Sequence, residues 1–485
     1  MKIKTLDQTH PNYNALGIAK RDALYSGGDK WHAQVAEFIP KNAEEPTPLW
    51  VERQNRATYE NNAGPIIDLI SAWLFSEAAQ VAGLGEGFLG DVDRRSTGWS
   101  AWWAQLFVSA QVQRRAFAWV NLPARSPVVA VASRADEEKA GLLNAYLVAL
   151  DAEKVLDWGD DEAGRLAWVM VKSCDSTRAG PEAERAVVHR WRFIDGTTIR
   201  TWEWRPTATS TAPKPDDDAQ ELVAIQHGIG ALPVVRLELA EGLWTMGKLS
   251  DPVIAHVRAS NDLDWSLHRA AHALMVIAIR DIATKPTLGA GYFLQVLRDK
   301  DGVDTVSYAE PTGASFDAQA KNADSKREAI YRVVQQMAMS ASQDAAPTKL
   351  SGASKAMDWQ SLQVMLAAYA VVLLTAMREI ATIVGKIRGV TDVEVSGLEG
   401  WQQEDIAALL EQAVLAVPLV PSPTYKREMA KLFARRLLPD VDAKITKAID
   451  AEIDAAEFVD PAPYVPPKRP GTPGEPGADE GGAAA

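Results

Sequence analysis

Three arginines with a constant spacing mark the middle of this chain. Arg258, Arg269 and Arg280 recur every eleven residues. Eleven steps of about 100° bring an α-helix back to within about 20° of the same face, so the three guanidinium groups would form one stripe. Such a stripe either is solvated and pairs with carboxylates such as Asp262 and Asp264, or it faces an adjacent subunit or a channel. The spacing alone leaves both interpretations open.

Two histidines on the same stretch resemble part of a metal site. His268 and His272 are one helical turn apart, and Asp264 lies one turn earlier. A metalloprotease pair would carry a glutamate between the histidines, and a structural site would need a further ligand. Neither is evident in the sequence, so we predict no metal ligands here.

A cluster of aspartates further along resembles a calcium loop. Asp299, Asp301 and Asp304 surround Gly302. The glycine falls at the wrong position for such a loop, and the terminal glutamate is missing. A hairpin turn at Asp301-Gly302 explains these residues better.

Motifs for catalysis or nucleotide binding are missing as well. The run GLGEGFLG at residues 83–90 could cradle a phosphate only after a strand and before a helix, whereas the pattern predicts a preceding helix and hence a turn. The sequence contains no HExxH, P-loop, GxSxG or paired-cysteine motif. We therefore predict no catalytic residues, no metal and no cofactor.

Composition limits the class of protein. A chain of 485 residues with 47% apolar content can bury a sizeable core and is expected to form two or more domains. The single cysteine, Cys174, excludes an intramolecular disulfide, and the polar residues 1–14 predict no secretory signal. Residues 362–377 are too short to span a membrane comfortably and predict a buried helix. A net charge of −13 opposes nonspecific nucleic-acid binding, but it does not exclude a protein past which DNA slides.

The periodicity of the first half predicts an α+β domain. Residues 10–80 and 99–118 are expected to be largely helical. Asp195-Gly196 is the strongest hairpin signal, because this dipeptide suits a two-residue primed turn. Trp191, Trp202 and Trp204 are expected to pack in the core, since no basic stripe accompanies them. Strands are predicted at residues 166–171, 187–194, 197–204, 221–226 and 233–239.

The second half is predicted to be mainly helical. Asp251 suits an N-cap and Pro252 the first position of a long helix. The tail from residue 461 is rich in Pro, Gly and Ala and is expected to be disordered. Helices are predicted at residues 253–282, 317–342, 355–388, 401–415, 425–438 and 440–457, and strands at residues 292–297, 303–308 and 391–398.

Three segments and the order of these elements carry a resemblance to a known family. The segments are RQNRATYENNAGPIID at residues 53–68, GALPVVR at residues 230–236 before the first long helix, and SGASKA at residues 351–356 at the third. Over residues 10–455 the chain resembles the portal proteins of tailed double-stranded DNA phages, the head-tail connectors at the capsid vertex. The family has no catalytic signature, so the order of the segments carries the likeness.

The resemblance implies a division of the chain into the parts of a portal subunit. An α/β wing would cover residues 1–249, a two-helix stem residues 250–284 and 317–342, and a small β clip residues 285–316. A tunnel loop would cover residues 343–354, and residues 355–399 would return to the wing with a long helix and a short strand. A helical crown would follow at residues 400–457, and a disordered tail at residues 458–485.

The resemblance also implies a function and partners. The subunits would form a dodecameric homo-oligomeric ring at the portal vertex of the virion capsid, assembled in the host cytoplasm, with no enzymatic activity and no membrane association. Double-stranded DNA would pass through nonspecifically during packaging and ejection. The implied protein partners are the major capsid protein, the terminase large subunit and a head-tail adaptor.

Candidate residues follow from this division. The arginine stripe would face the lumen or a neighbouring subunit. The tunnel-loop candidates are Gln343, Asp344, Thr348 and Lys349, of which only Asp344 and Lys349 carry a charge. The candidates for partner docking on the clip are Arg298, Asp299, Lys300 and Asp301.

The acidic composition suits such a channel. Many Lys or Arg contacts would hold DNA tightly, because affinity rises steeply with each neutralised phosphate. An acidic ring repels the backbone over the Debye length of about 8–10 Å, so we expect a net negative lumen with isolated basic rings. Two other classes stay open: a minor head protein that encloses no DNA, and a hydrolase with an unrecognised carboxylate site.

Overall fold

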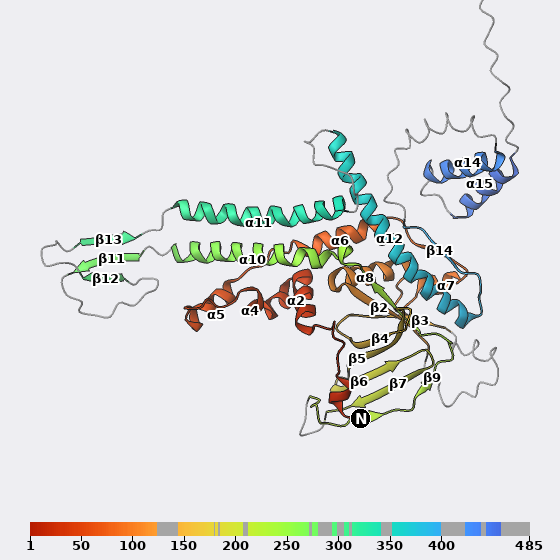
Figure 1. The fold of residues 1–485 in the computed structure, drawn as a ribbon, viewed down its shortest axis with the longest axis horizontal. Coiled ribbons are helices and arrows are strands. Elements are labelled where there is room, and N and C mark those ends of the chain that lie inside the picture. Colours follow the sequence, from red (N-terminus) through yellow and green to blue (C-terminus); the bar gives the residue numbers. More distant parts are fainter. Residues whose placement is uncertain are drawn as a thin grey trace, which may run out of the picture. The chain divides into compact units, whose positions relative to one another are not determined.

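The computed structural model is a mixed α+β protein in which helices predominate (Figure 1). The chain divides into two compact units, residues 1–402 and residues 403–485, and each is described by itself. The structure describes residues 1–123, 144–178, 180–182, 185–206, 212–270, 274–279, 293–297, 305–309, 313–340, 352–398, 422–437 and 443–456.

The N-terminal part of the first unit is helical, as the sequence predicts. Asn14 caps α2 by accepting a hydrogen bond from the Gly17 amide, 2.9 Å away. Within the residues 10–80 predicted to be largely helical, residues 57–62 are not helical, and α6 begins at Ala63. The helices of this part are α1 (Ile3–Leu6), α2 (Ala15–Ser26), α3 (Gly28–Ala33), α4 (Val35–Phe38), α5 (Thr47–Arg56), α6 (Ala63–Leu74), α7 (Glu86–Gly90) and α8 (Trp99–Gln113).

The helix α8 ends earlier than predicted. It stops at Gln113, Arg114 has a left-handed φ of 73°, and residues up to 118 belong to a strand instead of the helix. That strand, β2 (Arg115–Asn121), lies between β10 (Val234–Glu238) and β3 (Tyr146–Leu150). Its apolar side chains are buried on both faces, and such a continuous run does not distinguish strand from helix.

The larger sheet has six strands in the order β4-β5-β6-β7-β8, with β9 also paired to β7. The predicted packing of Trp191, Trp202 and Trp204 is confirmed, because all three are buried. The predicted strand over residues 221–226 is two short strands instead. The strands are β4 (Val155–Asp160), β5 (Leu166–Arg178), β6 (Arg185–Ile194), β7 (Thr198–Trp204), β8 (Gln220–Glu221) and β9 (Ile225–Gln226).

The hairpin β6–β7 is confirmed, but its turn is not a primed turn. Ile194 pairs with Ile199, and neither Asp195 nor Gly196 has a positive φ. The Asp195 carboxylate instead accepts hydrogen bonds from the amides of Thr197 and Thr198, each 2.7 Å long. This side-chain cap replaces the positive φ angles that the dipeptide suggested.

The glycine run at residues 83–90 follows a strand, not the predicted helix. The strand β1 (Gln80–Ala82) pairs antiparallel with β14 (Glu394–Ser396), and α7 follows the run's first glycines. A dinucleotide site requires a parallel β-α-β unit, so this antiparallel pair with a five-residue helix does not provide one.

The first long helix, α10 (Thr245–Ala270), differs from its prediction at both ends. It begins upstream of Asp251, so Pro252 lies inside the helix instead of at its start. Pro252 has no amide N–H to donate to the Lys248 carbonyl oxygen one turn earlier, and Lys248 is an exposed residue. The helix does not continue to residue 282, because Leu274–Ile279 form the strand β11.

The sheet after α10 corrects the predicted hairpin over residues 292–308. The strands β12 (Phe293–Leu297) and β13 (Thr305–Ala309) do not pair with each other, because β11 lies between them. Strand β12 is parallel to β11, and β13 is antiparallel to it. The aspartates around Gly302 lie outside the described residues.

Two further long helices complete the first unit. The helix α11 (Gly313–Ser340) lies beside α10 (Figure 1). The helix α12 (Gly352–Arg388) packs across the sheet of β10, β2 and β3 and ends where the sequence predicts. Within the described residues one helical stretch, Leu362–Arg388, is long and apolar enough to cross a membrane, but half of its most apolar window is buried in the protein. Its buried residues include Leu366, Tyr369, Leu373, Met377, Ile380 and Val384.

Two of the four cores among the described residues lie on opposite faces of β2. One joins α12, α8 and one face of β2, and includes Ala116, Ala118 and Val120. The opposite face of β2, with Phe117 and Trp119, packs on the six-stranded sheet. The helices and the two sheets thus form successive layers.

The second unit is helical where it is described. The helices α14 (Pro423–Leu437) and α15 (Ala443–Ala455) are joined by an ion pair between Lys431 and Asp454, 2.6 Å long. Both lie within the predicted helices over residues 425–438 and 440–457, apart from short shifts at their ends. The predicted helix over residues 401–415 and the predicted disordered tail lie outside the described residues.

Candidate functional site: the α10–α11 helix pair

The helix pair α10–α11 is attached to the protein along one side of α10. Met246, Leu249, Val253 and Val257 recur every three or four residues and are buried against α2, α6 and α8. A further stripe of α10 faces α11, and Ile330 of α11 is fully buried in the same core. The chain enters α11 from the three-stranded sheet that follows α10, so the two helices run antiparallel (Figure 1).

The helix α11 is covered along a single stripe in this chain. Over residues 314–334 its covered positions are 316, 319, 320, 323, 329, 330, 333 and 334, which fit one helical face interrupted by an exposed turn at residues 324–328. All its charged side chains in this stretch are exposed. They are Asp317, Lys321, Asp324, Lys326, Arg327, Glu328 and Arg332. The described residues therefore leave a long, mixed-charge face of α11 open to a partner.

The arginine stripe that the sequence suggested does not persist along one helix. The Arg258 Nε atom donates a hydrogen bond to the Phe38 carbonyl oxygen, 3.0 Å away, so this guanidinium holds the end of α4 against α10. Arg269 lies on the last turn of α10, and its side chain is outside the described residues, as is Arg280. Because α10 ends at Ala270, an eleven-residue helical repeat cannot place Arg280 on the same face.

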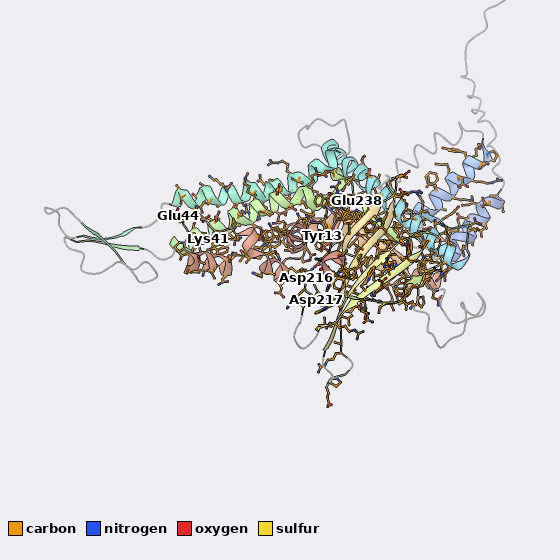
Figure 2. The ribbon with its side chains drawn as sticks, turned by 60° about the horizontal axis from the view of Figure 1, so that its bottom comes forward. Tyr13, Lys41, Glu44, Asp216, Asp217 and Glu238 are labelled. Carbon is orange, nitrogen blue, oxygen red and sulfur yellow. The ribbon has the colours of Figure 1, made fainter. Side chains whose placement is uncertain are left out.

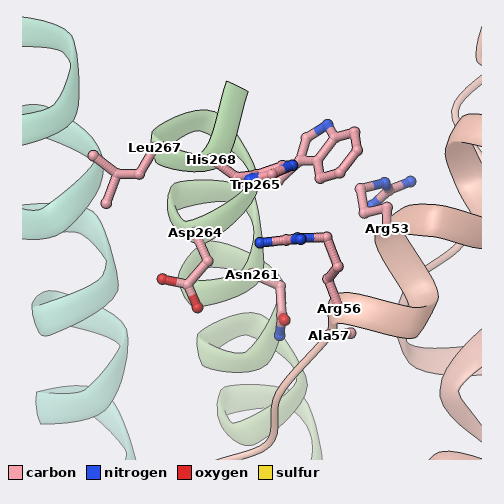
Figure 3. A pocket seen from close by; sticks show the side chains of 8 residues that line it. All are labelled: Arg53, Arg56, Ala57, Asn261, Asp264, Trp265, Leu267 and His268. Carbon is pink, nitrogen blue, oxygen red and sulfur yellow. The ribbon is translucent and has the colours of Figure 1, made fainter. Parts of the chain in front are cut away.

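A pocket of about 440 Å³ lies between α5 and α10 (Figure 3). Arg56 reaches from the end of α5 toward α10, and Asp264, Trp265 and His268 come from the last two turns of α10. Arg53 closes the side nearest α5. The pocket combines cations, one carboxylate and an indole ring, which are groups that recognise a polar partner.

Arg53 anchors the wall of this pocket. Its side chain is only 6% exposed and forms two hydrogen bonds with the Glu45 carboxylate, 3.0 and 2.7 Å long. It also donates to the Pro40 carbonyl oxygen at 2.8 Å. The hydrogen bonds that Arg53 donates to Glu45 lower the pKa of this carboxyl group below its ordinary value. The fork of donors on arginine suits this bidentate geometry.

A buried amide fixes the chain after α5 to α10. The Asn261 side chain accepts from the Thr58 amide at 2.8 Å and donates to the Thr58 carbonyl oxygen at 2.9 Å. It also donates to the Val257 carbonyl oxygen at 2.7 Å. Both of its N–H groups and its oxygen are engaged with the backbone, so Asn261 positions the wall of the pocket.

The titratable groups near the pocket show no arrangement for catalysis. Burial raises the pKa of Asp262 and lowers that of His256. His268 Nε2 lies 3.9 Å from a carboxylate oxygen of Glu52, and His272 is outside the described residues. Within the described ranges no three His, Cys, Asp or Glu side chains gather as metal ligands. The pocket can bind and orient a polar group, and its described residues supply no nucleophile-base pair.

The remaining predicted site residues fall outside the described part of the chain. These are the tunnel-loop candidates Gln343, Asp344, Thr348 and Lys349, and the clip candidates Arg298, Asp299, Lys300 and Asp301.

Sequence reasoning singled out Asp264 and His268, which line the pocket, but missed the contacts that shape it. Arg53 and Glu45 are eight positions apart and belong to no periodic pattern. The available signal was a pair of opposite charges, Glu45 before the start of α5 and Arg53 within it. Such pairs occur many times in any acidic protein. Asn261 looked like an ordinary polar residue within a helix.

No protein-family model matches this chain, and no curated protein matches it either.

Proposed function

We propose that this chain is the subunit of a portal, a ring at a phage capsid vertex through which double-stranded DNA is packaged and ejected. The ring would consist of twelve copies, and it would dock the packaging terminase, a head-tail adaptor and the major capsid protein. The proposal rests on the sequence likeness in residues 53–68, 230–236 and 351–356 together with the order of the elements.

The observation that carries the proposal is the excursion from α10 to α11. One long helix leaves an α+β body, a three-stranded sheet follows, and a second long helix returns beside the first. A stem and a clip would have this form. On the proposal, stem helix 1 is Thr245–Ala270 instead of residues 250–284, and the clip begins by Leu274 instead of residue 285.

The charges on the helix pair support a channel wall that does not grip DNA. The exposed face of α11 alternates acidic and basic side chains, and Arg327 pairs with Asp324 at 2.9 Å. Neither helix carries a continuous basic stripe in its described part. A duplex moving along such a surface would meet few stable phosphate contacts, so its passage would cost little at each step.

The open face of α11 supports ring formation. A ring of identical subunits needs two different, complementary surfaces on each copy, because its contacts are heterologous. The mixed charges of α11 and the pocket between α5 and α10 are two different surfaces of this kind.

Electron microscopy and native mass spectrometry of the purified chain test the proposal. We expect annular particles with a central hole and a mass of about 630 kDa, that of twelve 52.7-kDa chains. Replacing Lys326 and Arg327 with glutamate should reduce ring formation and leave the circular dichroism of the subunit unchanged. The matched control replaces Lys2 and Lys4, which are exposed basic residues far along the chain from α11. Compact monomers, or oligomers without a hole, would refute the portal proposal, and the second outcome would favour a minor head protein.

A further inference from the structure

A second pocket, of about 270 Å³, lies apart from the helix pair where α2, β2 and β10 meet. Three arginines line it, and the indole rings of Trp158 and Trp244 form part of its wall. Tyr13 and Glu238, two other lining residues, are labelled in Figure 2 near the border between the helices and the sheets. The pocket therefore gathers guanidinium groups that come from distant parts of the sequence.

Arg21 contributes free donors to this pocket. Its Nε atom donates to the Gln113 side chain at 3.0 Å, and Gln113 in turn donates to the Ile18 carbonyl oxygen at 3.0 Å. The guanidinium carbon lies 5.3 Å from the centre of the Trp244 ring. Among the described residues, no carboxylate lies within 4.0 Å of Arg21, and no acceptor forms a hydrogen bond with its two terminal nitrogens.

Arg115 lines the same pocket. Its side chain is 13% exposed and is stacked 4.7 Å from the centre of the Trp158 ring. The nearest carboxylate, on Glu238, is 3.5 Å away and is shared with Arg114 at 4.0 Å and Arg236 at 3.1 Å. Arg114 also pairs with Glu241 and Arg236 with Asp160, so Arg115 is the one of the three whose described ion pairing is limited to the shared Glu238.

Arg114 is held beside these two residues by its backbone. It adopts a left-handed φ of 73°, which is uncommon for a residue with a side chain. Its guanidinium pairs with Glu241 at 3.1 Å and lies 6.0 Å from the Trp244 ring centre. The sharp turn from α8 into β2 thus brings two consecutive arginines to one pocket.

The electrostatics of the pocket favour an added anion. The pKa of Arg21 is lowered by burial and by the neighbouring charge of Arg115. Burial also lowers the pKa of Arg115, and Glu238 only partly opposes this. Arginine stays protonated at any physiological pH, so these like charges remain close together and poorly hydrated. An oxyanion between them would relieve the repulsion and occupy the free donors.

We propose that this pocket binds an oxyanion, a carboxylate or a phosphate, between the guanidinium groups of Arg21 and Arg115. The pocket is slightly smaller than the usual ligand sites of about 300 Å³ or more, so it suits a small anion or the tip of one acidic side chain. The oxyanion comes either from a free solute or from a carboxylate of a second copy of this chain. The site stands on its own residues and does not depend on the portal proposal.

Thermal unfolding with added anions tests the site. The probes are inorganic phosphate and glutarate, which copies a glutamate side chain, each at constant ionic strength set with chloride. We expect both to raise the melting temperature of the wild-type protein, because a ligand that binds only the folded state stabilises it. Arg21→Gln should raise the half-saturating concentration about tenfold, since losing one charge-assisted hydrogen bond corresponds to about that factor.

Two further variants keep this test decisive. Arg200→Gln is the matched control, because Arg200 also stacks on an indole ring, that of Trp202 at 4.9 Å, but lies outside the pocket and pairs with Glu221. It should bind both anions as the wild type does. Arg21→Lys keeps the charge and loses the planar fork, so it should bind more weakly than the wild type and more tightly than Arg21→Gln.

The source of the oxyanion is distinguished by measuring assembly at several protein concentrations. If a second copy supplies it, Arg21→Gln shifts assembly to about tenfold higher protein concentration, and phosphate competes with assembly. If a free solute supplies it, phosphate stabilises the protein without changing assembly. Either result supports the site. The proposal is overturned if Arg21→Gln and Arg200→Gln behave alike toward both anions and in assembly.

Discussion

The buried ion pair between Arg53 and Glu45 allows a quantitative test of how the pocket beside α10 is held. The two side chains are 6% and 10% exposed, and two hydrogen bonds join them. Glu45→Gln preserves the shape of the side chain and removes its charge. Arg53 would keep the Pro40 carbonyl oxygen, and its only other carboxylate neighbour among the described residues is Asp262, 4.0 Å away and mostly exposed.

The expected loss in the free energy of unfolding of Glu45→Gln follows from leaving the Arg53 charge buried without its carboxylate partner. Removing one partner of a buried ion pair costs about 3–5 kcal/mol. We expect the lower end, about 3 kcal/mol, because the glutamine can still accept one hydrogen bond from Arg53. The neighbouring Glu44 is exposed, so Glu44→Gln should change the free energy of unfolding by less than about 0.5 kcal/mol. Figure 2 labels Glu44 close to Lys41.

Urea unfolding at pH 7, followed by tryptophan fluorescence, measures both variants. Arg53→Met with Glu45→Gln should recover much of the loss, because an apolar residue of similar size leaves no unpaired charge. Equal stability of Glu45→Gln and Glu44→Gln would refute the reasoning, since the carboxylate could then not be the essential partner of Arg53.

The pH dependence gives an independent check on the same pair. The bond with Arg53 holds the pKa of Glu45 below its ordinary value of 4.5. A carboxyl group with a lowered pKa stabilises the folded state above its unfolded pKa, and this contribution is lost as the pH falls through its folded pKa. The difference between wild type and Glu45→Gln should therefore be constant above about pH 5 and should shrink below pH 4.5. A difference that persists unchanged at pH 3 would contradict the assignment.

Further measurements probe the core, the sheet and the helix pair. Ile330→Ala should lower the free energy of unfolding by about 2–4 kcal/mol, and the exposed Tyr331→Ala by less than about 0.5 kcal/mol, in the same urea assay. Burial raises the pKa of Tyr369 to about 12, so stability should fall as the pH rises from 10 toward 12, and Tyr369→Phe should show a shallower fall. The exposed Cys174 should react with a thiol reagent in the folded protein at one equivalent per chain, whereas a protected thiol would contradict its position on β5. Amide exchange along α11 should slow as the protein concentration rises, and an exchange rate independent of concentration would mean that no partner covers this helix.

Long periodic segments were predictable from the sequence because one face of each is buried. The end of α12 at Arg388 and the hairpin β6–β7 are examples. Two of the failures, at residues 115–118 and at residues 274–279, share a physical cause. Each falls on a continuous apolar run, residues 116–120 and 274–279, in a central strand of a sheet, and an apolar run of this length does not reveal its own period. Because the second run also fits a helix, the sequence predicts that its neighbouring strands pair with each other.

The candidate sites were less predictable than the fold because their residues meet only through tertiary packing. Arg21 and Arg115 are separated by most of the N-terminal helical part, and no local pattern relates them. The arginine repeat failed for the opposite reason. Its spacing was real, but a helical repeat has meaning only while the helix lasts, and α10 ends at Ala270.

On the portal proposal, α11 would link the stability of the subunit to its assembly. A helix in a protein owes most of its stability to the packing of its apolar face, and not to its intrinsic propensity. Along α11, Ile330 is the one fully buried side chain between residues 314 and 334, and the rest of that face is only partly covered by α10 and α12. Any partner that covers the open, charged face must therefore add a large share of the packing that this 28-residue helix receives. By mass action, association and the ordering of α11 would then favour each other, so ring formation would further stabilise α11 in each subunit.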